Sequence, residues 1–229
     1  MADHLANFYP DWVEKEETPR QIILDLGKMI TNNVRVKLGF QKLNKYDPEY
    51  WGLATLLTDE QAELALKMGL RKPRTMADIV SLTGKKEEEL EPLLADMSFK
   101  GILEYNWENP TRTKQWVLPM FVPGSAEFTN MNDVILKNFP EMGRFFERMS
   151  RLPLERVSAM VPPGGAGIGM HVIPVEKAIG TENEAIPIER ISHWLDKYEG
   201  KYAASPCSCR KSRQTFDEGC ADDPEDWCI

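Results

Sequence analysis

The stretch TDEQAELALKMGLRKPRTMADIVSLTGKKEEELEPLLADMSFKGILEYNWENPTRTKQWVL, residues 58–118, decides the fold of this chain. Two capping boxes, Thr58 with Gln61 and Thr75 with Asp78, predict where its first two helices begin, because residues at this spacing satisfy each other's free backbone groups. A third helix is expected from about residue 86 to residue 100. A glycine stands where each helix should end. These glycines are Gly69, Gly84 and Gly101.

Two strand-like runs follow the third helix. Residues 102–107 and 115–118 flank a polar turn at 108–110, a pattern that predicts a β-hairpin. Three helices followed by a hairpin form the winged-helix arrangement. The expected fold class is therefore α+β and mostly helical, with a winged-helix-like domain followed by a small α/β domain.

The rest of the chain is divided around this stretch. We expect residues 1–18, which are polar and acidic, to form a loose arm, and helices to begin at Pro19 and to cover 47–57. An amphipathic helix over 129–151 should kink or split at Pro140. The expected organisation is an N-terminal arm and helices (1–56), the winged-helix-like domain with the long helix (57–160), a Gly/Pro linker (161–170) and a cysteine-cluster domain (171–229) that contains a strand at 171–175 and a helix at 187–198.

Composition and charge narrow the classes of function. The 229 residues carry a formal net charge of −8, which argues against non-specific nucleic-acid binding. No apolar run approaches the length that spans a bilayer, and the first residues lack the pattern of a signal peptide. We therefore expect a cytoplasmic protein without membrane contact, in which cysteines stay reduced and serve metal binding rather than cross-linking.

All four cysteines lie in the last 23 residues, at the spacing C-x-C-x10-C-x7-C. In an extended backbone, residues two apart share a face, so Cys207 and Cys209 are expected to present both sulfurs to one metal site. Cys220 and Cys228 complete four thiolates, the ligand set of iron–sulfur clusters and of tetrahedral zinc. Zinc ligands usually occur as C-x2-C pairs, and a Cys-x-Cys disulfide would be strained. Spacing alone leaves iron–sulfur, zinc and free or disulfide-bonded thiols open.

Three cations follow the second cysteine. Arg210 and Lys211 come directly after Cys209, and Arg213 is close. One interpretation is that they stabilise the negative charge of a thiolate-ligated cluster, with Arg210 as the nearest contact. The other is that they offset the acidic residues at 217–226 on a solvated loop. Both interpretations remain open from the sequence.

The segment PCSCR … GC … DDPEDWCI, residues 206–229, resembles the cluster signature of a group of iron–sulfur proteins from anaerobes. The lead-in from His171 and the winged-helix-like region fit the same layout. In larger relatives this module precedes ferredoxin-type or flavin- and NAD(P)-binding domains of pyridine-nucleotide oxidoreductases.

This resemblance implies an electron-transfer module with a [4Fe–4S] cluster held by Cys207, Cys209, Cys220 and Cys228. Its partner would be a redox protein or a flavin domain. The chain ends one residue after the last cysteine, so we expect it to be the N-terminal part or a subunit of a larger oxidoreductase. Whether it forms a homo-oligomer or joins a larger complex stays open.

Several other features have ordinary structural explanations. Residues 85–100 hold three lysines and five acidic residues, a net charge of −2, so the third helix should not read DNA. The glycine-rich run at 164–169 follows no convincing strand, so a hinge is expected there rather than a nucleotide site. His171 and His193 are expected to be packed or solvated, and Trp51, Trp107, Trp116 and Trp194 to fill cores.

No nucleophile–base arrangement is evident, so the sequence supports no independent catalytic site. The alternative to an electron-transfer module is a zinc-stabilised interaction or regulatory protein built on a winged helix.

Overall fold

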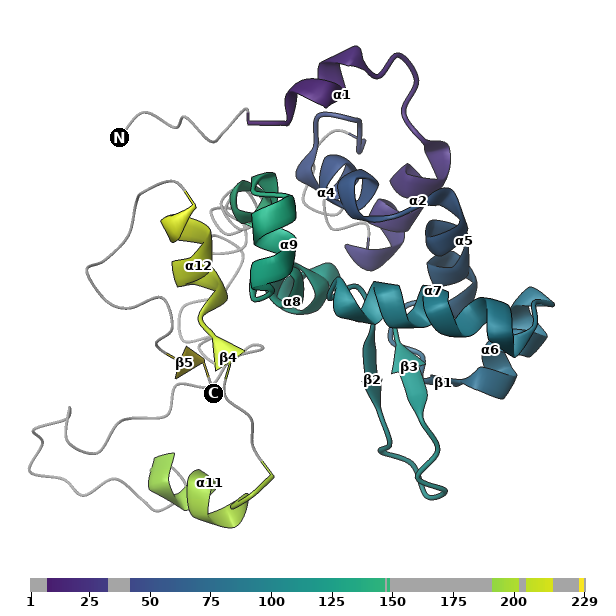
Figure 1. The fold of residues 1–229 in the computed structure, drawn as a ribbon, viewed down its shortest axis with the longest axis vertical. Coiled ribbons are helices and arrows are strands. Elements are labelled where there is room, and N and C mark those ends of the chain that lie inside the picture. Colours follow the sequence, from purple (N-terminus) through teal and green to yellow (C-terminus); the bar gives the residue numbers. More distant parts are fainter. Residues whose placement is uncertain are drawn as a thin grey trace, which may run out of the picture.

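The computed structural model describes residues 8–32, 42–146, 148, 191–201, 205–215 and 227–228. The expected linker, the strand at 171–175, His171 and Cys220 lie outside the described residues. Within them the chain is mostly helical, with a three-stranded sheet and a separate pair of short strands, as Figure 1 shows. The expectation of a mostly helical α+β fold is confirmed.

The stretch 58–118 forms the predicted helices and hairpin. In chain order its elements are α5 (Asp59–Met68), β1 (Arg74–Thr75), α6 (Met76–Thr83), α7 (Glu87–Phe99), β2 (Glu104–Asn106) and β3 (Gln115–Val117). The strand β3 lies between β1 and β2 and is antiparallel to both, with Trp116 opposite Arg74 on one side and opposite Tyr105 on the other. The sequence pattern did not indicate β1, because two residues are too few to show an alternation.

Local signals begin and end the helices as expected. The Thr58 hydroxyl accepts a hydrogen bond from the Gln61 N–H at 3.2 Å, and the Gln61 side chain accepts one from the Thr58 N–H at 3.1 Å. The second capping box, Thr75 with Asp78, is also complete. Positive φ angles of 75°, 72° and 77° occur at the three predicted stop glycines, Gly69, Gly84 and Gly101.

The N-terminal region contributes α1 (Asp11–Lys15), α2 (Gln21–Ile30) and α4 (Pro48–Leu56). The expected loose arm is wrong over its described part, because α1 packs on the core. Val13 is fully buried, and the Phe8 ring meets the Trp51 ring edge-on at a centroid distance of 5.7 Å. A few apolar residues among the acidic ones are enough to dock this short helix.

One hydrophobic core links these helices with the stretch that follows. Its largest fully buried side chains are Trp51 and Tyr50. The Tyr50 hydroxyl accepts a hydrogen bond from the Arg20 N–H at 2.7 Å and donates one to the Glu16 carboxylate at 2.8 Å. Burial is the largest cause that raises the pKa of Tyr50 to about 12. This phenol therefore remains a neutral hydrogen-bond donor inside the core.

The tryptophan predictions have mixed outcomes. Trp51 and Trp116 are buried as expected. Trp107, on the hairpin just after β2, is 47% exposed, so its predicted core position is wrong. Its ring packs edge-on against Tyr105 at 5.7 Å on the surface of the hairpin. Trp194 is only half-buried.

The predicted long helix is divided into shorter pieces. After a π-helical turn, Phe121–Ser125, come α8 (Ala126–Asn130), α9 (Asp133–Asn138) and a helical segment at 141–146. The break before Pro140 was expected. The earlier break was not, and Asn132 causes it by accepting hydrogen bonds from the N–H groups of Val134 and Ile135 at the start of α9.

The C-terminal elements are α11 (Ile191–Lys197), β4 (Ser205–Pro206), α12 (Ser208–Gln214) and β5 (Trp227–Cys228). The helix expected at 187–198 is present over its described part. The strand β4 pairs antiparallel with β5, and α12 lies beside α8 and α9 (Figure 1). No helix among the described residues combines the length and hydrophobicity that crossing a bilayer requires.

Candidate metal centre

Cys207 and Cys209 lie at the start of α12. Cys207 is the residue just before the helix, with an extended backbone (ψ 113°), whereas Cys209 is the second helical residue. The expected extended backbone is therefore correct through Cys207 and wrong at Cys209. The residues from Ser208 onward form a helix instead of an irregular loop, because one side of that helix packs against α8 and α9.

The two thiols nevertheless lie close to each other. The pKa of Cys209 is raised, first by burial around its sulfur and then by the Cys207 thiol, which lies close enough to act both as a charge and as a hydrogen-bond partner. A hydrogen bond from Ser208 acts in the opposite direction. The predicted convergence of Cys207 and Cys209 is thus produced by a strand-to-helix turn, and not by a continuous strand.

A third cysteine is brought to this turn by the backbone. In the β4–β5 pair, Ser205 lies opposite Cys228 and Pro206 opposite Trp227. Residues directly opposite in an antiparallel pair have Cα atoms about 4.5–5.5 Å apart. Cys228 is therefore beside a residue that is two positions before Cys207, although the two cysteines are 21 positions apart in the sequence.

The donors at this turn match part of a four-thiolate site. Cys207 is half-buried and Cys209 is exposed, and neither forms a disulfide. The side chain of Cys228 and all of Cys220 lie outside the described residues. Among the side chains that are described, no group of three or more histidine, cysteine, aspartate or glutamate residues could hold a metal ion. Two adjacent soft thiols, with a third cysteine on the paired strand, fit an iron–sulfur or zinc site.

One acidic side chain lies near these thiols. Glu127, on α8, accepts a hydrogen bond from the Gly124 N–H at 2.7 Å, and its charge contributes to the raised pKa of Cys209. Burial is the largest cause that raises the pKa of Glu127 itself. A partly buried carboxylate thus adds negative charge at the edge of the candidate site.

Four polar residues, three on one face of α12 and one just after its end, hold this helix against the rest of the protein. Their spacing is i, i+3, i+4 and i+7, which places them on one side of a helix. The Ser212 hydroxyl donates to the Gly143 carbonyl at 2.7 Å, and the Lys211 ammonium pairs with Asp133 at 3.1 Å. A Cβ on Gly143 would lie only 2.3–2.8 Å from side-chain atoms of Thr215. The four residues are Ser208, Lys211, Ser212 and Thr215.

The sequence did not indicate that this polar face of α12 contacts the rest of the protein. A helix that docks through serine, lysine and threonine shows no hydrophobic periodicity, so nothing distinguished it from a solvated loop. The solvated-loop interpretation is wrong for Lys211, which is 7% exposed and paired with Asp133 on α9, whereas the contribution of these cations to a cluster stays a prediction. Arg210 lies in the same first turn as Cys209 and is half-buried.

The sequence also did not indicate the role of Asn130, the last residue of α8. Its side-chain Nδ2 donates a hydrogen bond to the Ser208 carbonyl, in the peptide link between Cys207 and Cys209. Asn130 is fully buried. A single asparagine near a helix end carries no sequence signal that would distinguish this role from a surface position.

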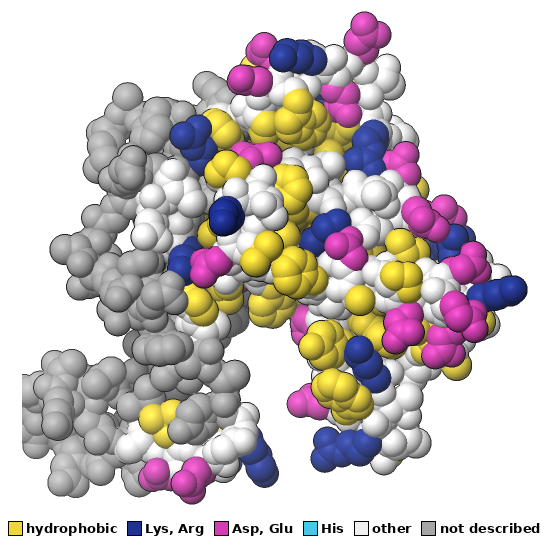
Figure 2. All heavy atoms as spheres, in the orientation of Figure 1, with side chains coloured by type: hydrophobic (Ala, Val, Ile, Leu, Met, Phe, Trp, Pro, Cys, Tyr) yellow, Lys and Arg dark blue, Asp and Glu magenta, His cyan; other side chains and the backbone are white. Residues whose placement is uncertain are grey.

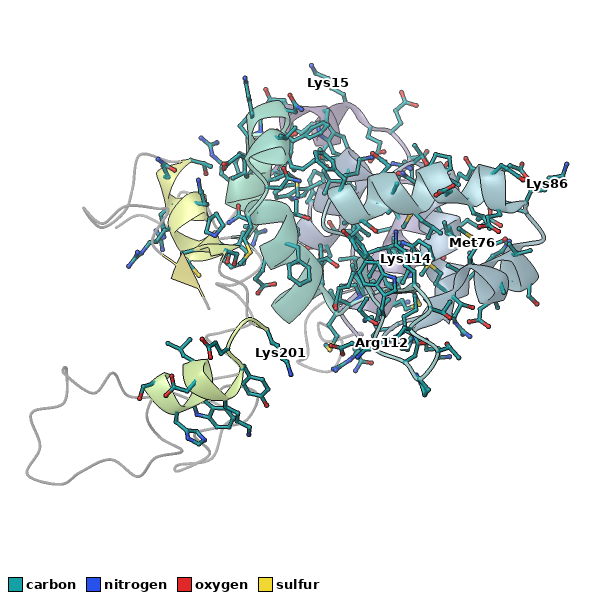
Figure 3. The ribbon with its side chains drawn as sticks, turned by 60° about the horizontal axis from the view of Figure 1, so that its bottom comes forward. Lys15, Met76, Lys86, Arg112, Lys114 and Lys201 are labelled. Carbon is teal, nitrogen blue, oxygen red and sulfur yellow. The ribbon has the colours of Figure 1, made fainter. Side chains whose placement is uncertain are left out.

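On the side seen in Figure 2, the stretch 58–118 shows no continuous basic patch. Acidic side chains gather over the end of the molecule where α6 meets the start of α7 (Figure 2). Lys86 stands at that outer end of α7, away from Arg112 and Lys114 on the hairpin (Figure 3). The Lys114 ammonium lies over the rings of Tyr105 and Trp116, at 4.7 and 4.8 Å from their centroids. These cations do not converge on one surface.

His193 is half-buried and packs edge-on against Trp194 at 5.5 Å, a structural contact. The glycine-rich run at 164–169 lies outside the described residues.

Comparison of the chain with protein-family models, with curated proteins and with solved structures finds no match.

Proposed function

We propose that this protein is an electron-transfer module that binds one [4Fe–4S] cluster through Cys207, Cys209, Cys220 and Cys228. One observation carries the proposal: the interacting thiols of Cys207 and Cys209 lie at the end of β4, the strand that pairs with the backbone of Cys228. When bound, such a cluster would accept and release single electrons.

The chain's own residues would hold and tune the site. The face of α12 that bears Ser212 and Lys211 fixes the helix against Gly143 and Asp133, so the two cysteines at its start are held on a docked element. Arg210 in the first turn supplies positive charge next to Cys209, and Glu127 supplies negative charge nearby. Charges around a cluster set its reduction potential.

The scaffold in this proposal is a winged helix. Its support is the element order α5, β1, α6, α7, β2 and β3, with β3 between the other two strands. The acidic start of α7 and the scattered cations favour a structural role over DNA binding. The electron partner would be a flavin- or cluster-containing domain or subunit of an NAD(P)H-linked oxidoreductase.

Metal analysis of anaerobically reconstituted protein tests this function. We expect about four iron and four sulfide ions per chain, with a broad visible absorbance that bleaches on reduction. Changing Cys209→Ser should lower the iron content and shift the electron paramagnetic resonance spectrum of the reduced protein. Ser81→Ala, at an exposed position on α6, is the control and should retain wild-type iron. Unchanged iron in Cys209→Ser would contradict the four-cysteine assignment.

The second candidate is a zinc-stabilised interaction or regulatory protein. Four thiolates also suit tetrahedral zinc, and the raised pKa of Cys209 is compatible with a thiol that loses its proton only when a metal binds. A colourless protein that contains one zinc per chain would favour this alternative. A gel shift with duplex DNA at two salt concentrations then separates a DNA-binding regulator from a protein-contact module.

A further inference from the structure

The contact between Asn130 and Ser208 joins α8 directly to the peptide that links the first two cysteines. The Asn130 amide donates to the Ser208 carbonyl across 78 positions of sequence. Asn130 is 0% exposed and Ser208 is 4% exposed. The contact is thus sealed from solvent on both sides.

A buried asparagine at this position has a free-energy cost that an apolar residue would not have. Its Oδ1 accepts no hydrogen bond within the described part of the chain. Leaving a buried polar atom unpaired is unfavourable, and an apolar side chain of the same size would avoid that penalty. What asparagine supplies and leucine does not is one donor of fixed direction, aimed at the Ser208 carbonyl.

The direction of that carbonyl fixes the first two cysteines relative to each other. A peptide unit is rigid and planar, so holding the Ser208 oxygen also fixes the plane that ends at the Cys209 nitrogen and Cα. Cys207 precedes this unit by one residue, and its thiol already interacts with that of Cys209. The Asn130 amide therefore restrains the backbone from which both thiols project.

From this geometry we infer that Asn130 is a positioning residue for the metal centre, holding Cys207 and Cys209 in the arrangement that a shared metal requires. The inference rests on the proposed function, because it assumes that these cysteines are ligands. It differs from general support of α12, since Ser212 and Lys211 also anchor that helix but do so beyond the peptide between the two cysteines. Residues that orient metal ligands typically change metal affinity by about 10–100-fold when they are removed.

The test uses Asn130→Leu, which keeps a similar volume but lacks the donor. Asn132→Leu is the matched control, because Asn132 also donates its amide to a backbone carbonyl, but to that of Phe99 at the end of α7, at 2.7 Å. Ser212→Ala is a second control that weakens the docking of α12 alone. The readout is the affinity of the reduced, metal-free protein for Co²⁺, whose visible spectrum reports thiolate coordination.

We expect Asn130→Leu to bind Co²⁺ about 10–100-fold more weakly than wild type, Asn132→Leu to stay within about threefold, and Ser212→Ala to lose clearly less affinity than Asn130→Leu. After iron reconstitution, Asn130→Leu should also change the ratio of oxidised to reduced cluster at a fixed potential by about tenfold, equivalent to 59 mV for one electron. Asn130→Asp, which keeps the shape but is an acceptor only when ionised, replaces Asn130→Leu if circular dichroism shows that the leucine variant is unfolded.

Wild-type affinity and potential in the Asn130 variants would overturn the inference while leaving the proposed function intact. An equal loss of affinity in Ser212→Ala would also overturn it, because α12 docking alone would then explain the effect. If the wild-type protein binds neither iron nor Co²⁺, both the proposed function and the role of Asn130 fail.

Discussion

At the scale of single residues, a few buried polar side chains determine how the candidate site is held. Asn130 contacts the peptide between two cysteines, Lys211 pairs with Asp133, and Glu127 lies near the Cys209 thiol. None of the three belongs to a recognisable motif. Each has its role because tertiary packing removes it from water. Hydrogen bonds and charges act more strongly in the protein interior than in water.

Glu127 provides a prediction about pH. Burial raises its pKa in the folded protein above the value of 4.5 for a free side chain, so the folded state holds this proton more tightly than the unfolded state. Stability from this group is then present at low pH and is lost as pH rises from 4.5 through the folded pKa. Glu127→Gln should therefore be more stable than wild type at pH 7, and the difference should disappear near pH 4.

Urea unfolding of the two proteins at both pH values measures this difference. Glu108→Gln, at an exposed hairpin position, controls for the loss of one negative charge. If the Glu127→Gln advantage is the same at both pH values, burial of this carboxylate is not its cause.

At the scale of elements, the capping boxes and stop glycines work as local signals, but the glycines are not equivalent. At Gly84 a Cβ would meet nothing within 4 Å, whereas at Gly101 it would lie 2.6 Å from the Thr129 nitrogen and 2.7 Å from the Phe128 carbonyl carbon. Gly101 thus ends α7 and also lets α8 pack closely against that end. The Thr129 hydroxyl strengthens this junction by donating to the Lys100 carbonyl at 2.8 Å.

Alanine substitutions should separate these two roles. Gly84→Ala should lower the free energy of unfolding by roughly 1–2 kcal/mol, because a left-handed backbone conformation is unfavourable for an L-residue with a Cβ. Gly101→Ala adds a collision with backbone atoms, so we expect about 3–5 kcal/mol in total. Urea denaturation measures both values, and equal costs would show that the close approach of α8 has no energetic weight.

Most of the elements in 58–118 could be predicted because their signals are local. A capping box acts over three residues, and a stop glycine acts at its own φ angle. The strands β1, β4 and β5 could not be predicted, because each has two residues and depends on a distant partner. Val134 lies in the stretch expected to form one amphipathic helix, but it is 50% exposed because Asn132 begins a new helix just before it.

At the scale of the whole molecule, the candidate site depends on how α12 docks on the segment at 141–146. Gly143 is the point of closest approach, since any side chain there would overlap Thr215. The carbonyl of the same glycine accepts the Ser212 hydroxyl at 2.7 Å. The missing side chain of Gly143 and the hydrogen bond to its carbonyl therefore position the helix that carries Cys209.

Gly143→Ala should release α12 while leaving the rest of the core folded. Overpacking of about 1–3 kcal/mol would raise the fraction of undocked α12, and limited trypsin cleavage at Lys211 and Arg213 should become about tenfold faster. Adding Thr215→Gly removes the overlapping side chain and should restore slow cleavage, with Thr215→Gly alone as the control. Equal cleavage rates in wild type and Gly143→Ala would contradict the docking role of Gly143.

The sequence by itself determined the three helices and hairpin of 58–118, their starts and stops, and the grouping of four cysteines near the C-terminal end of the chain. These features follow from interactions within a few residues or from composition, which need no knowledge of distant contacts. Only the tertiary structure decided that Cys209 begins a helix, that β4 pairs with β5, and that Asn130 and Gly143 face α12. Those contacts join polar groups across 21 to 78 positions of sequence, and polar packing leaves no periodic pattern along the chain.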